Sequence, residues 1–277
     1  MNEGMLYICA TPIGNLEDIT LRVLRVLGEV ELIAAEDTRH TAKLLAHYEI
    51  KTPMTSYHEN NKVEKGAYLI ERMLDGANIA LVSDSGMPCI SDPGRELVFA
   101  CYEAGIVVTV CPGASAGLTG LVLSGFRARP HVFEGFLPRD KSNRKKLLFA
   151  LANETRTMVF YEAPHRLLAT LAEMHEHLGN RKIALCRELT KKFEEVMHGT
   201  ISEVMNNFSN KQPKGEFVIV MEGTDGTPTQ YFNDITSHVE QYLNQGYSEM
   251  EAMKLVAKDR GLSKRQVYGK IKVNIDN

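Results

Sequence analysis

Short apolar segments alternate with longer amphipathic segments along the first 112 residues of the chain. The short segments are rich in Val, Ile and Leu, which is typical of buried β-strands, and the longer ones carry apolar residues at helical spacing. Such alternation predicts a parallel sheet that is covered by helices on both faces. We expect strands over residues 5–9, 30–35, 79–82 and 106–110, and helices that begin after Thr20 or cover residues 41–48, 62–74 and 92–103.

The second half has a different pattern, because two of its apolar segments follow each other with only a short polar stretch between them. Residues 183–187 and 194–198 therefore predict a hairpin, and a hairpin makes the sheet mixed rather than parallel. The expected strands are residues 131–134, 157–161, 183–187, 194–198 and 217–221, and the expected helices are residues 142–151, 165–177 and 201–208.

Two turn-forming segments mark the candidate domain boundaries. Pro112 and Gly113 interrupt the pattern after the first sheet, and a loop over residues 224–228 ends the second. The residues beyond that loop have a helical pattern throughout. The sequence therefore predicts an α/β domain over residues 1–112, a second α/β domain over residues 113–227 and a helical tail over residues 228–277.

Composition narrows the class of protein. The chain has 277 residues, of which 44% are hydrophobic and 24% charged, as in ordinary globular proteins. No apolar run approaches the roughly 20 residues that a membrane helix needs, and the N-terminus has neither the basic region nor the apolar core of a signal peptide. The five cysteines lack the paired Cys/His spacing of a zinc site. We therefore expect a cytoplasmic protein that contacts no membrane and binds no metal.

Four loops rich in small residues each follow a predicted strand. In a parallel sheet the carboxyl ends of the strands lie along one edge, where α/β proteins bind ligands. Small residues leave room for a ligand and let backbone N–H and C=O groups face it. A side chain added at Gly14 or Gly113 is therefore expected to weaken ligand binding without unfolding the chain. The four loops cover residues 11–15, 83–88, 112–116 and 161–166.

Seven segments of the chain carry the motifs of a known family. The most specific are Glu-Asp-Thr-Arg at residues 36–39 and Tyr-Glu-Ala-Pro-His-Arg at residues 161–166. With these motifs the chain closely resembles the ribosomal RNA small-subunit methyltransferase I family, within the tetrapyrrole-methylase superfamily of S-adenosylmethionine-dependent enzymes. The seven segments are residues 10–20, 35–39, 83–88, 112–116, 160–166, 187–191 and 214–217.

The resemblance implies a fold, a cofactor and a reaction. The implied fold has two α/β domains of the tetrapyrrole-methylase type, with S-adenosyl-L-methionine bound in the cleft between them, and the implied assembly is a homodimer. The implied reaction is methyl transfer to the ribose 2′-hydroxyl of a cytidine in the decoding region of small-subunit (16S) ribosomal RNA. The cofactor contacts carried over by motif are Pro12, Ile13, Gly14, Asp84, Met87, Ser115, Ala116, Tyr161, Glu162, Gly215 and Glu216.

A ribose hydroxyl is a poor nucleophile, so its methylation needs a base or a cation that stabilises the developing alkoxide. The strand-end candidates for these roles are Glu36, Asp37, Arg39, Glu162 and His165. Asp37 and Arg39 have a structural alternative, as an ion pair or with Asp37 as a helix cap. The sequence leaves the identity of the base open.

Basic residues are unevenly distributed, although the net charge is −3. Residues 127–146 hold seven Lys and Arg against two acidic residues, a density that suits phosphate contacts. In the tail, residues 248–260 and 264–273 predict two helices joined by a short turn in which Ser263 caps the second, which resembles a helix-turn-helix module. The alternatives are a solvated helix face for the cluster and dimer support for the tail. The candidate RNA-binding residues are Arg127, Arg129, Arg144, Lys145, Lys146, Lys264, Arg265 and Lys270.

Two other functions remain open at this level. One is methylation of a tetrapyrrole or of a protein side chain by an enzyme of the same superfamily. The basic cluster, the tail and the Glu-Asp-Thr-Arg motif argue against it. The other is a non-catalytic factor that binds RNA during ribosome assembly, and a failure to bind S-adenosylmethionine would favour it.

Overall fold

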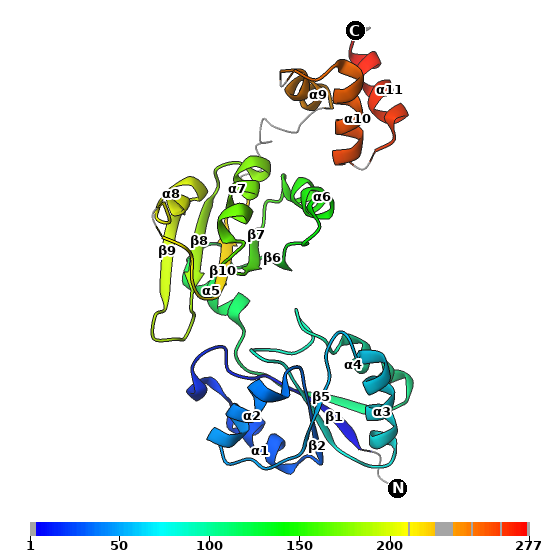
Figure 1. The fold of residues 1–277 in the computed structure, drawn as a ribbon, viewed down its shortest axis with the longest axis vertical. Coiled ribbons are helices and arrows are strands. Elements are labelled where there is room, and N and C mark those ends of the chain that lie inside the picture. Colours follow the sequence, from blue (N-terminus) through cyan, green and yellow to red (C-terminus); the bar gives the residue numbers. More distant parts are fainter. Residues whose placement is uncertain (1–3, 210, 225–234, 245, 261, 276–277) are drawn as a thin grey trace. The chain divides into compact units, whose positions relative to one another are not determined.

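The computed structural model describes residues 4–209, 211–224, 235–244, 246–260 and 262–275, and Figure 1 draws its ribbon. The chain divides into two compact units. The first unit contains residues 1–119 and a short segment from far along the chain, residues 189–193. The second contains residues 120–188 and 194–277, so the described tail helices group with it. The domain boundaries expected after residues 112 and 227 stay predictions.

The first unit is built on a five-stranded parallel sheet with strand order β3-β2-β4-β1-β5. The parallel sheet covered by helices is thereby confirmed. The third strand is only three residues long and lies at the edge, where pairing with one neighbour suffices. The strands are β1 Met5–Cys9, β2 Leu32–Ala35, β3 Met54–Ser56, β4 Ile79–Val82 and β5 Val107–Cys111.

Alternate residues of these strands enter two different cores, as the two-residue period of a strand requires. Leu6, Leu32 and Ile79 pack with α3 (Lys62–Leu74) and α4 (Arg95–Glu103) on one face. The intervening residues, such as Ile33 and Ala80, pack on the other face with α1 (Leu21–Glu29) and α2 (Thr38–His47). Both faces are therefore buried, and the strand-end loops are left at one edge of the sheet.

Two helices of this unit begin at residues other than the predicted ones. Helix α2 begins at Thr38, because the Asp37 carboxylate accepts a hydrogen bond from the Arg39 amide and caps the helix there. Helix α4 begins at Arg95 rather than at residue 92, because Gly94 has φ +140° and interrupts the helical backbone. A Cβ at Gly94 would lie 2.7 Å from the Leu81 Cδ2 atom, so only glycine fits. By contrast, the predicted Thr20 cap is present, with the Thr20 hydroxyl 3.2 Å from the Val23 amide.

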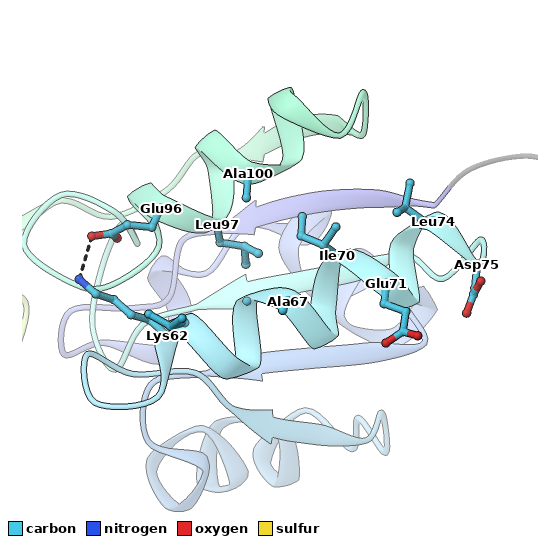
Figure 2. A pocket seen from close by; sticks show the side chains of 11 residues that line it. Lys62, Ala67, Ile70, Glu71, Leu74, Asp75, Glu96, Leu97 and Ala100 are labelled. Atoms are coloured by element: carbon cyan, nitrogen blue, oxygen red, sulfur yellow. Dashed lines mark hydrogen bonds and ion pairs between the residues drawn. The ribbon is translucent and has the colours of Figure 1, made fainter.

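Helices α3 and α4 lie side by side and leave a groove of about 610 Å³ between them (Figure 2). Its lining combines small residues, such as Ala67 and Ala100, with larger apolar ones, such as Ile70 and Leu97. One end is closed by Lys62, whose ammonium nitrogen lies 2.8 Å from a carboxylate oxygen of Glu96. Gly66 has open space beyond its missing Cβ, so packing does not require glycine at this helical position.

The second unit is built on a mixed five-stranded sheet with strand order β6-β7-β10-β8-β9. Only β6 and β7 are parallel, and β8 and β9 form the predicted hairpin. A register shift between Phe133 and Gly135 interrupts the β6–β7 pairing. The strands are β6 His131–Phe136, β7 Thr157–Glu162, β8 Lys182–Arg187, β9 Glu195–Thr200 and β10 Phe217–Met221.

One face of the second sheet packs against α6 (Lys141–Leu151), α7 (Leu167–Leu178) and α8 (Ile201–Asn206) around a fully buried core. Helix α5 (Ala116–Ser124) is an element that the sequence pattern did not predict. It lacks a polar face, and its Gly120 lies so close to the sheet that a Cβ there would be 2.9 Å from Val218 Cγ1. Because α5 packs closely on the sheet and has no polar face, its sequence lacks the amphipathic pattern from which a helix is predicted.

The tail forms three helices, α9 Ile235–Asn244, α10 Glu249–Arg260 and α11 Lys264–Ile275, around an apolar core of their own. The predicted helical character is thus confirmed for the described tail residues. The cap of α11 is also confirmed, since the Gln266 amide donates to the Ser263 hydroxyl at 3.3 Å. Most of the predicted loop at 224–228, namely residues 225–228, lies outside the described residues.

Candidate functional site

The loops that follow β1 and β4 are locked together by backbone hydrogen bonds. The Thr11 amide donates to the Gly86 carbonyl at 2.9 Å, and the Gly86 amide donates back to the Thr11 carbonyl at 3.1 Å. The buried Thr11 hydroxyl donates to the Ser83 carbonyl at 3.2 Å. Two of the four predicted loops therefore lie side by side at one edge of the sheet, as their places in a parallel sheet led us to expect.

Glycine is required in these loops because neighbouring residues of the chain leave no room for a Cβ. Gly86 has φ +78°, and a Cβ there would lie 3.2 Å from Ile13 Cγ2. A Cβ at Gly113 would lie 2.8 Å from the Cβ of Ala10, and one at Gly14 would lie 2.9 Å from the Thr190 hydroxyl. The expectation that side chains at Gly14 and Gly113 meet a ligand without disturbing the fold is therefore wrong, because they would first meet neighbouring loops.

A group of acidic residues surrounds the end of β2. The Asp84 carboxylate accepts a hydrogen bond from the Asp37 amide at 3.1 Å, and the Asp84 amide donates to the Glu36 carboxylate at 3.4 Å. Burial, reinforced by the negative charges of Asp92 and Asp84, raises the pKa of the Glu36 carboxyl above its usual value. Burial also raises the pKa of Asp92. Glu36 therefore holds a proton more tightly than an ordinary glutamate does.

Asp37 and Arg39 form the structural pair that the sequence analysis named as an alternative. The Asp37 carboxylate accepts from the Arg39 amide at 2.8 Å and from the guanidinium at 2.7 Å and 3.0 Å. These hydrogen bonds hold the pKa of Asp37 well below its usual range. The Arg39 side chain is 89% exposed. The pair caps α2 at the surface, so neither residue has the properties of a buried general base.

The other predicted cofactor positions of the first unit lie in the same loops but differ in what their side chains do. Ile13 is buried, and Pro12 and Asp84 are half-buried. Met87 packs against the core beneath the sheet, so its side chain is already engaged. Ser115 and Ala116 lie at the start of α5, where the Ser115 carbonyl accepts the first hydrogen bond of the helix, from the Thr119 amide at 3.0 Å.

Residues 189–193, between β8 and β9, belong to the first unit although the strands that flank them belong to the second. The Thr190 hydroxyl accepts a hydrogen bond from the Asn15 amide at 3.0 Å. Glu188 and Thr190 have φ +51° and +65°, a left-handed conformation that costs free energy in residues other than glycine. Residues 187–191 carry a family motif, but the motif alone indicates no role for this segment. Its contact with the loop after β1 makes it part of the candidate site.

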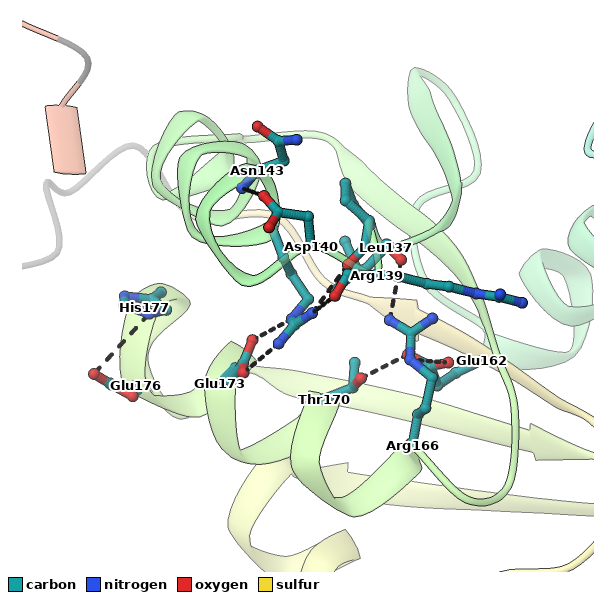
Figure 3. Close-up of polar contacts among 12 residues, drawn as sticks. Leu137, Arg139, Asp140, Asn143, Glu162, Arg166, Thr170, Glu173, Glu176 and His177 are labelled. Atoms are coloured by element: carbon teal, nitrogen blue, oxygen red, sulfur yellow. Dashed lines mark hydrogen bonds and ion pairs between the residues drawn. The ribbon is translucent and has the colours of Figure 1, made fainter. Parts of the chain in front are cut away.

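Glu162 lies at the end of β7 and is engaged inside the second unit (Figure 3). Its carboxylate accepts from the Thr170 hydroxyl at 2.6 Å and from the Ala163 amide at 2.8 Å, and it lies 3.5 Å from the Arg166 guanidinium. Its side chain has no exposed surface. The Glu162 carboxylate therefore fixes the turn that follows β7, which argues against a catalytic role for this side chain, while a cofactor contact at residue 162 stays a prediction.

Two further predicted residues lie nearby, Tyr161 in the last part of β7 and His165 in the turn after it. His165 is exposed. Tyr161 is half-buried and packs edge to face against two aromatic rings of β6, with centroid distances of 5.1 Å to Phe133 and 5.5 Å to Phe136. The two phenylalanines are 37% and 53% exposed. An apolar aromatic surface thus accompanies the end of β7.

Gly215 and Glu216 precede β10 and are held by Glu188. The Glu216 amide donates to the Glu188 carboxylate at 2.9 Å, and the Glu188 amide donates to the Glu216 carbonyl at 3.0 Å. Gly215 has φ +97°, and a Cβ there would lie 2.6 Å from Glu188 Cγ. The two motifs at 187–191 and 214–217 therefore meet in space and support each other.

The basic cluster of residues 127–146 contains one residue that is structural. Arg144 donates to both carboxylate oxygens of Glu173, at 2.5 Å and 2.7 Å, and to the carbonyls of Pro138 and Arg139 (Figure 3). The side chains of Arg144 and Glu173 are only 14% and 20% exposed. The expectation that Arg144 contacts RNA is therefore wrong, because its donors are already used within the fold.

The remaining basic candidates are at the surface where the structure describes them. Arg127 and Arg129 are exposed before β6, and Lys146 is exposed and Lys145 half-buried on α6. In the tail, Lys264 and Arg265 are exposed on α11. The side chain of Lys270 lies outside the described residues.

Neither a membrane span nor a metal centre is found in the described residues. None of the helices in this part of the chain combines the length and apolar character that crossing a bilayer requires. The same residues contain no group of three or more His, Cys, Asp or Glu side chains placed to hold a metal ion.

Known proteins resemble the chain over most of its length. The family of Tetrapyrrole (Corrin/Porphyrin) Methylases matches residues 5–205. A protein of Bacillus subtilis named ribosomal RNA small subunit methyltransferase I is 50% identical over 271 residues, which cover 96% of this chain and 93% of that protein. A Synechocystis protein of the same name is 45% identical over 268 residues, which cover 96% of this chain and 96% of that protein.

Solved structures share the fold at low sequence identity. Uroporphyrin-III-C-methyltransferase from Thermus thermophilus has a TM-score of 0.57 and 22% identity, over 78% of this chain and 94% of that one. A structure of that enzyme type complexed with S-adenyl homocysteine has a TM-score of 0.56 and 19% identity, over 78% and 97% of the two chains. A diphthine synthase has a TM-score of 0.60 and 11% identity, over 79% and 90%.

The fold class predicted from the sequence is confirmed by these likenesses, and the family is confirmed by the identity of 50% over nearly the whole chain. The chain therefore belongs to the tetrapyrrole methylase family and, within it, to the ribosomal RNA small subunit methyltransferase I proteins.

Proposed function

We propose that this protein uses S-adenosyl-L-methionine to methylate the ribose 2′-hydroxyl of a cytidine in the decoding region of small-subunit (16S) ribosomal RNA. The observation that carries the proposal is the 50% identity to a small subunit methyltransferase I over 96% of the chain. The joined loops after β1 and β4 support it, because family motifs form this edge of the sheet. The choice of a cytidine and of its ribose 2′-hydroxyl as the methylated group rests on the family resemblance.

The strand-end loops of the first unit fit a small polar cofactor. Hydrogen bonds join two of these loops, glycines allow the backbone to approach closely, and the loops carry both apolar and acidic side chains. We assign the cofactor contacts here to Pro12, Ile13, Asp84, Ser115 and Ala116, and in the second unit to Tyr161, Gly215 and Glu216. When bound, the cofactor supplies an electrophilic methyl group. These residues hold and orient it, which is the main requirement of a direct displacement.

Glu36 is the residue that we assign as the general base. A base is effective when its pKa lies near the working pH, and the pKa of Glu36 is raised by burial and by its acidic neighbours. Asp37 is unsuitable because its hydrogen bonds to Arg39 lower its pKa and make its carboxylate a weak proton acceptor. Glu36 would accept the proton of the ribose hydroxyl, and the hydroxyl oxygen would take the methyl group that the bound cofactor would supply, with S-adenosylhomocysteine as the leaving product. His165, which is exposed, stays a secondary candidate.

RNA contacts in the proposal come from exposed cations at the periphery. Arg127, Arg129, Lys145 and Lys146 lie in the second unit, and Lys264 and Arg265 lie in its tail. Phosphate contacts of this kind position a polyanion without reading its sequence. The proposal also includes a cytoplasmic homodimer, for which apolar side chains such as Val122, 76% exposed, offer contact area.

The decisive experiment maps 2′-O-methylation on small subunits from cells that lack this protein. Subunits are incubated with S-adenosylmethionine and either the wild type or Glu36→Gln. The wild type should restore one methylated cytidine, and Glu36→Gln should bind the cofactor but transfer the methyl group slowly. A wild type that binds S-adenosylmethionine but methylates only a protein or a tetrapyrrole would overturn the RNA assignment. Full activity of Glu36→Gln would overturn only the choice of base.

A further inference from the structure

Two basic segments that lie about a hundred residues apart in the sequence line one pocket in the second unit. Helix α6 supplies one wall, and the tail helices α9 and α10 supply the other. The pocket has a volume of about 580 Å³, within the range of about 300–1,000 Å³ that is usual for small-ligand sites. The basic cluster and the tail are separate features of the sequence, and the structure brings them together.

Aromatic rings form a continuous row along this pocket. The rings of Phe149 and His238 are stacked with a centroid distance of 6.3 Å, and those of His238 and Tyr242 are stacked at 5.5 Å. Tyr247 continues the row with its ring edge-on to Tyr242 at 5.7 Å, and it is 45% exposed. Tyr247 therefore stands at the outer end of the row, where a further flat group can pack against it.

Lysines from both walls border the rings. Lys145 and Lys146 come from α6 and Lys258 from α10, and all three line the pocket. Within the described parts of the chain, the structure gives no ion pair to any of these three lysines. The two carboxylates of the lining are Asp140, which caps α6 through the Asn143 amide, and Glu176 at the end of α7 (Figure 3). Cations are thus the excess charge beside the rings.

We propose that this pocket binds one unstacked nucleotide of single-stranded RNA. A base presents a flat face that stacks on an aromatic ring, and its phosphates are anions that pair with lysine. A baseless polyanion would use the lysines alone, and an apolar peptide would use the rings alone. The inference rests on the proposed function and deepens it, because it assigns a substrate contact away from the strand-end loops of the first unit.

The test measures binding of a fluorescent six-nucleotide single-stranded RNA to the full chain by anisotropy. Tyr247→Leu removes the ring while keeping an apolar side chain, and its matched control is Tyr102→Leu, at a tyrosine that is 65% exposed on α4. Lys145→Gln and Lys258→Gln remove one cation from each wall, and their control is Lys182→Gln at the exposed start of β8. Lys258 is exposed and Lys145 half-buried, so the lysine variants keep the test valid if Tyr247→Leu destabilises the tail.

Tyr247→Leu should weaken RNA binding by about fivefold or more, as expected when one base loses its stacking partner. Each lysine variant should lower the slope of log Kd against log salt by about 0.7. The controls should bind as the wild type does. Inorganic polyphosphate, which has no bases, should respond to the lysine variants but not to Tyr247→Leu. Equal RNA binding by Tyr247→Leu and Tyr102→Leu would overturn the proposal, and so would lysine variants that bind with the wild-type slope.

The proposed function can fail separately. If the wild type methylates small subunits while all the pocket variants bind RNA like their controls, the pocket assignment fails and the proposed function stands. If Tyr247→Leu loses RNA binding while the wild type transfers no methyl group to RNA, the pocket assignment stands and the proposed function fails.

Discussion

The hydroxyl of Thr170 on α7 donates a 2.6 Å hydrogen bond to the carboxylate of Glu162 at the end of β7. Both residues are buried, so the carboxylate has no water to replace this donor. The contact ties the motif that follows β7 to the helix beneath it. The family motif at residues 161–166 therefore includes a residue whose importance is structural before it is chemical.

Thr170→Val should destabilise the protein by about 1–3 kcal/mol, because it leaves a buried acceptor with one donor fewer at almost unchanged volume. Urea unfolding measures the change in the free energy of unfolding. His165→Ala is the control, since this exposed neighbour in the same turn should alter stability by less than about 0.5 kcal/mol. Equal stabilities of the two variants would show that the hydrogen bond contributes nothing.

Arg144→Ala should cost about 3 kcal/mol, because it leaves the mostly buried Glu173 carboxylate without its cation. Lys146→Ala, at an exposed position two residues further along α6, should change stability by less than about 0.5 kcal/mol. A double-mutant cycle with Glu173→Gln separates the free energy of the Arg144–Glu173 interaction from the other effects of each substitution. If Arg144→Ala instead kept full stability and lost RNA binding, the assignment of Arg144 to the fold would be wrong.

Two glycines of the first unit should respond to alanine with opposite signs. Gly86→Ala forces alanine into φ +78° and against Ile13, and should cost about 1–2 kcal/mol while weakening S-adenosylmethionine binding. Gly66→Ala lies inside α3 with open space around it, and should stabilise by about 0.5–1 kcal/mol. Calorimetry and thermal unfolding report both effects. Cofactor binding by Gly86→Ala at wild-type affinity would contradict the placement of the loop.

The sequence was sufficient to predict those strands and helix caps whose local residue pattern agrees with their role in the folded protein. Strands β1 and β4 read as short apolar runs because both faces of the sheet are covered, and the caps at Thr20 and Ser263 have the residue types that caps require. The α5 helix escaped prediction because its Gly120 serves close packing on the sheet and breaks the amphipathic pattern.

The site was harder to predict because ionisable residues in a motif give no sign of their partners. Glu162 and Arg144 have the residue types of a catalytic carboxylate and a phosphate ligand, yet Thr170 and Glu173 engage them from the next helix. The role of Thr190 depends on contact with Asn15, far away in the sequence. Pairings across such separations come from the fold, and a single sequence does not contain them in readable form.

Glu36→Gln should change stability in a pH-dependent way. The pKa of Glu36 is raised in the folded protein, so its contribution to stability is present in full below the unfolded value of 4.5 and is lost as the pH rises through the folded value. The variant should therefore gain more stability relative to wild type at pH 7 than at pH 4. Urea midpoints across this range measure it, with the exposed Glu64→Gln as the matched control. A larger gain at pH 4 than at pH 7 would contradict the raised pKa.

The salt dependence of RNA binding should depend on the tail. Lys264 and Arg265 are exposed at the start of α11, and each phosphate contact that they make releases counterions when RNA binds. Replacing both with Gln should reduce the slope of log Kd against log salt by about 1.4–1.8, at about 0.7–0.9 for each contact. S-adenosylmethionine affinity should not change, because the strand-end loops hold the cofactor. The double variant Lys182→Gln and Lys211→Gln removes the same charge elsewhere in the second unit and should keep the wild-type slope. Equal slopes for the two double variants would assign Lys264 and Arg265 to an ordinary solvated helix face, and the tail would then contact RNA through other residues or only support the second unit.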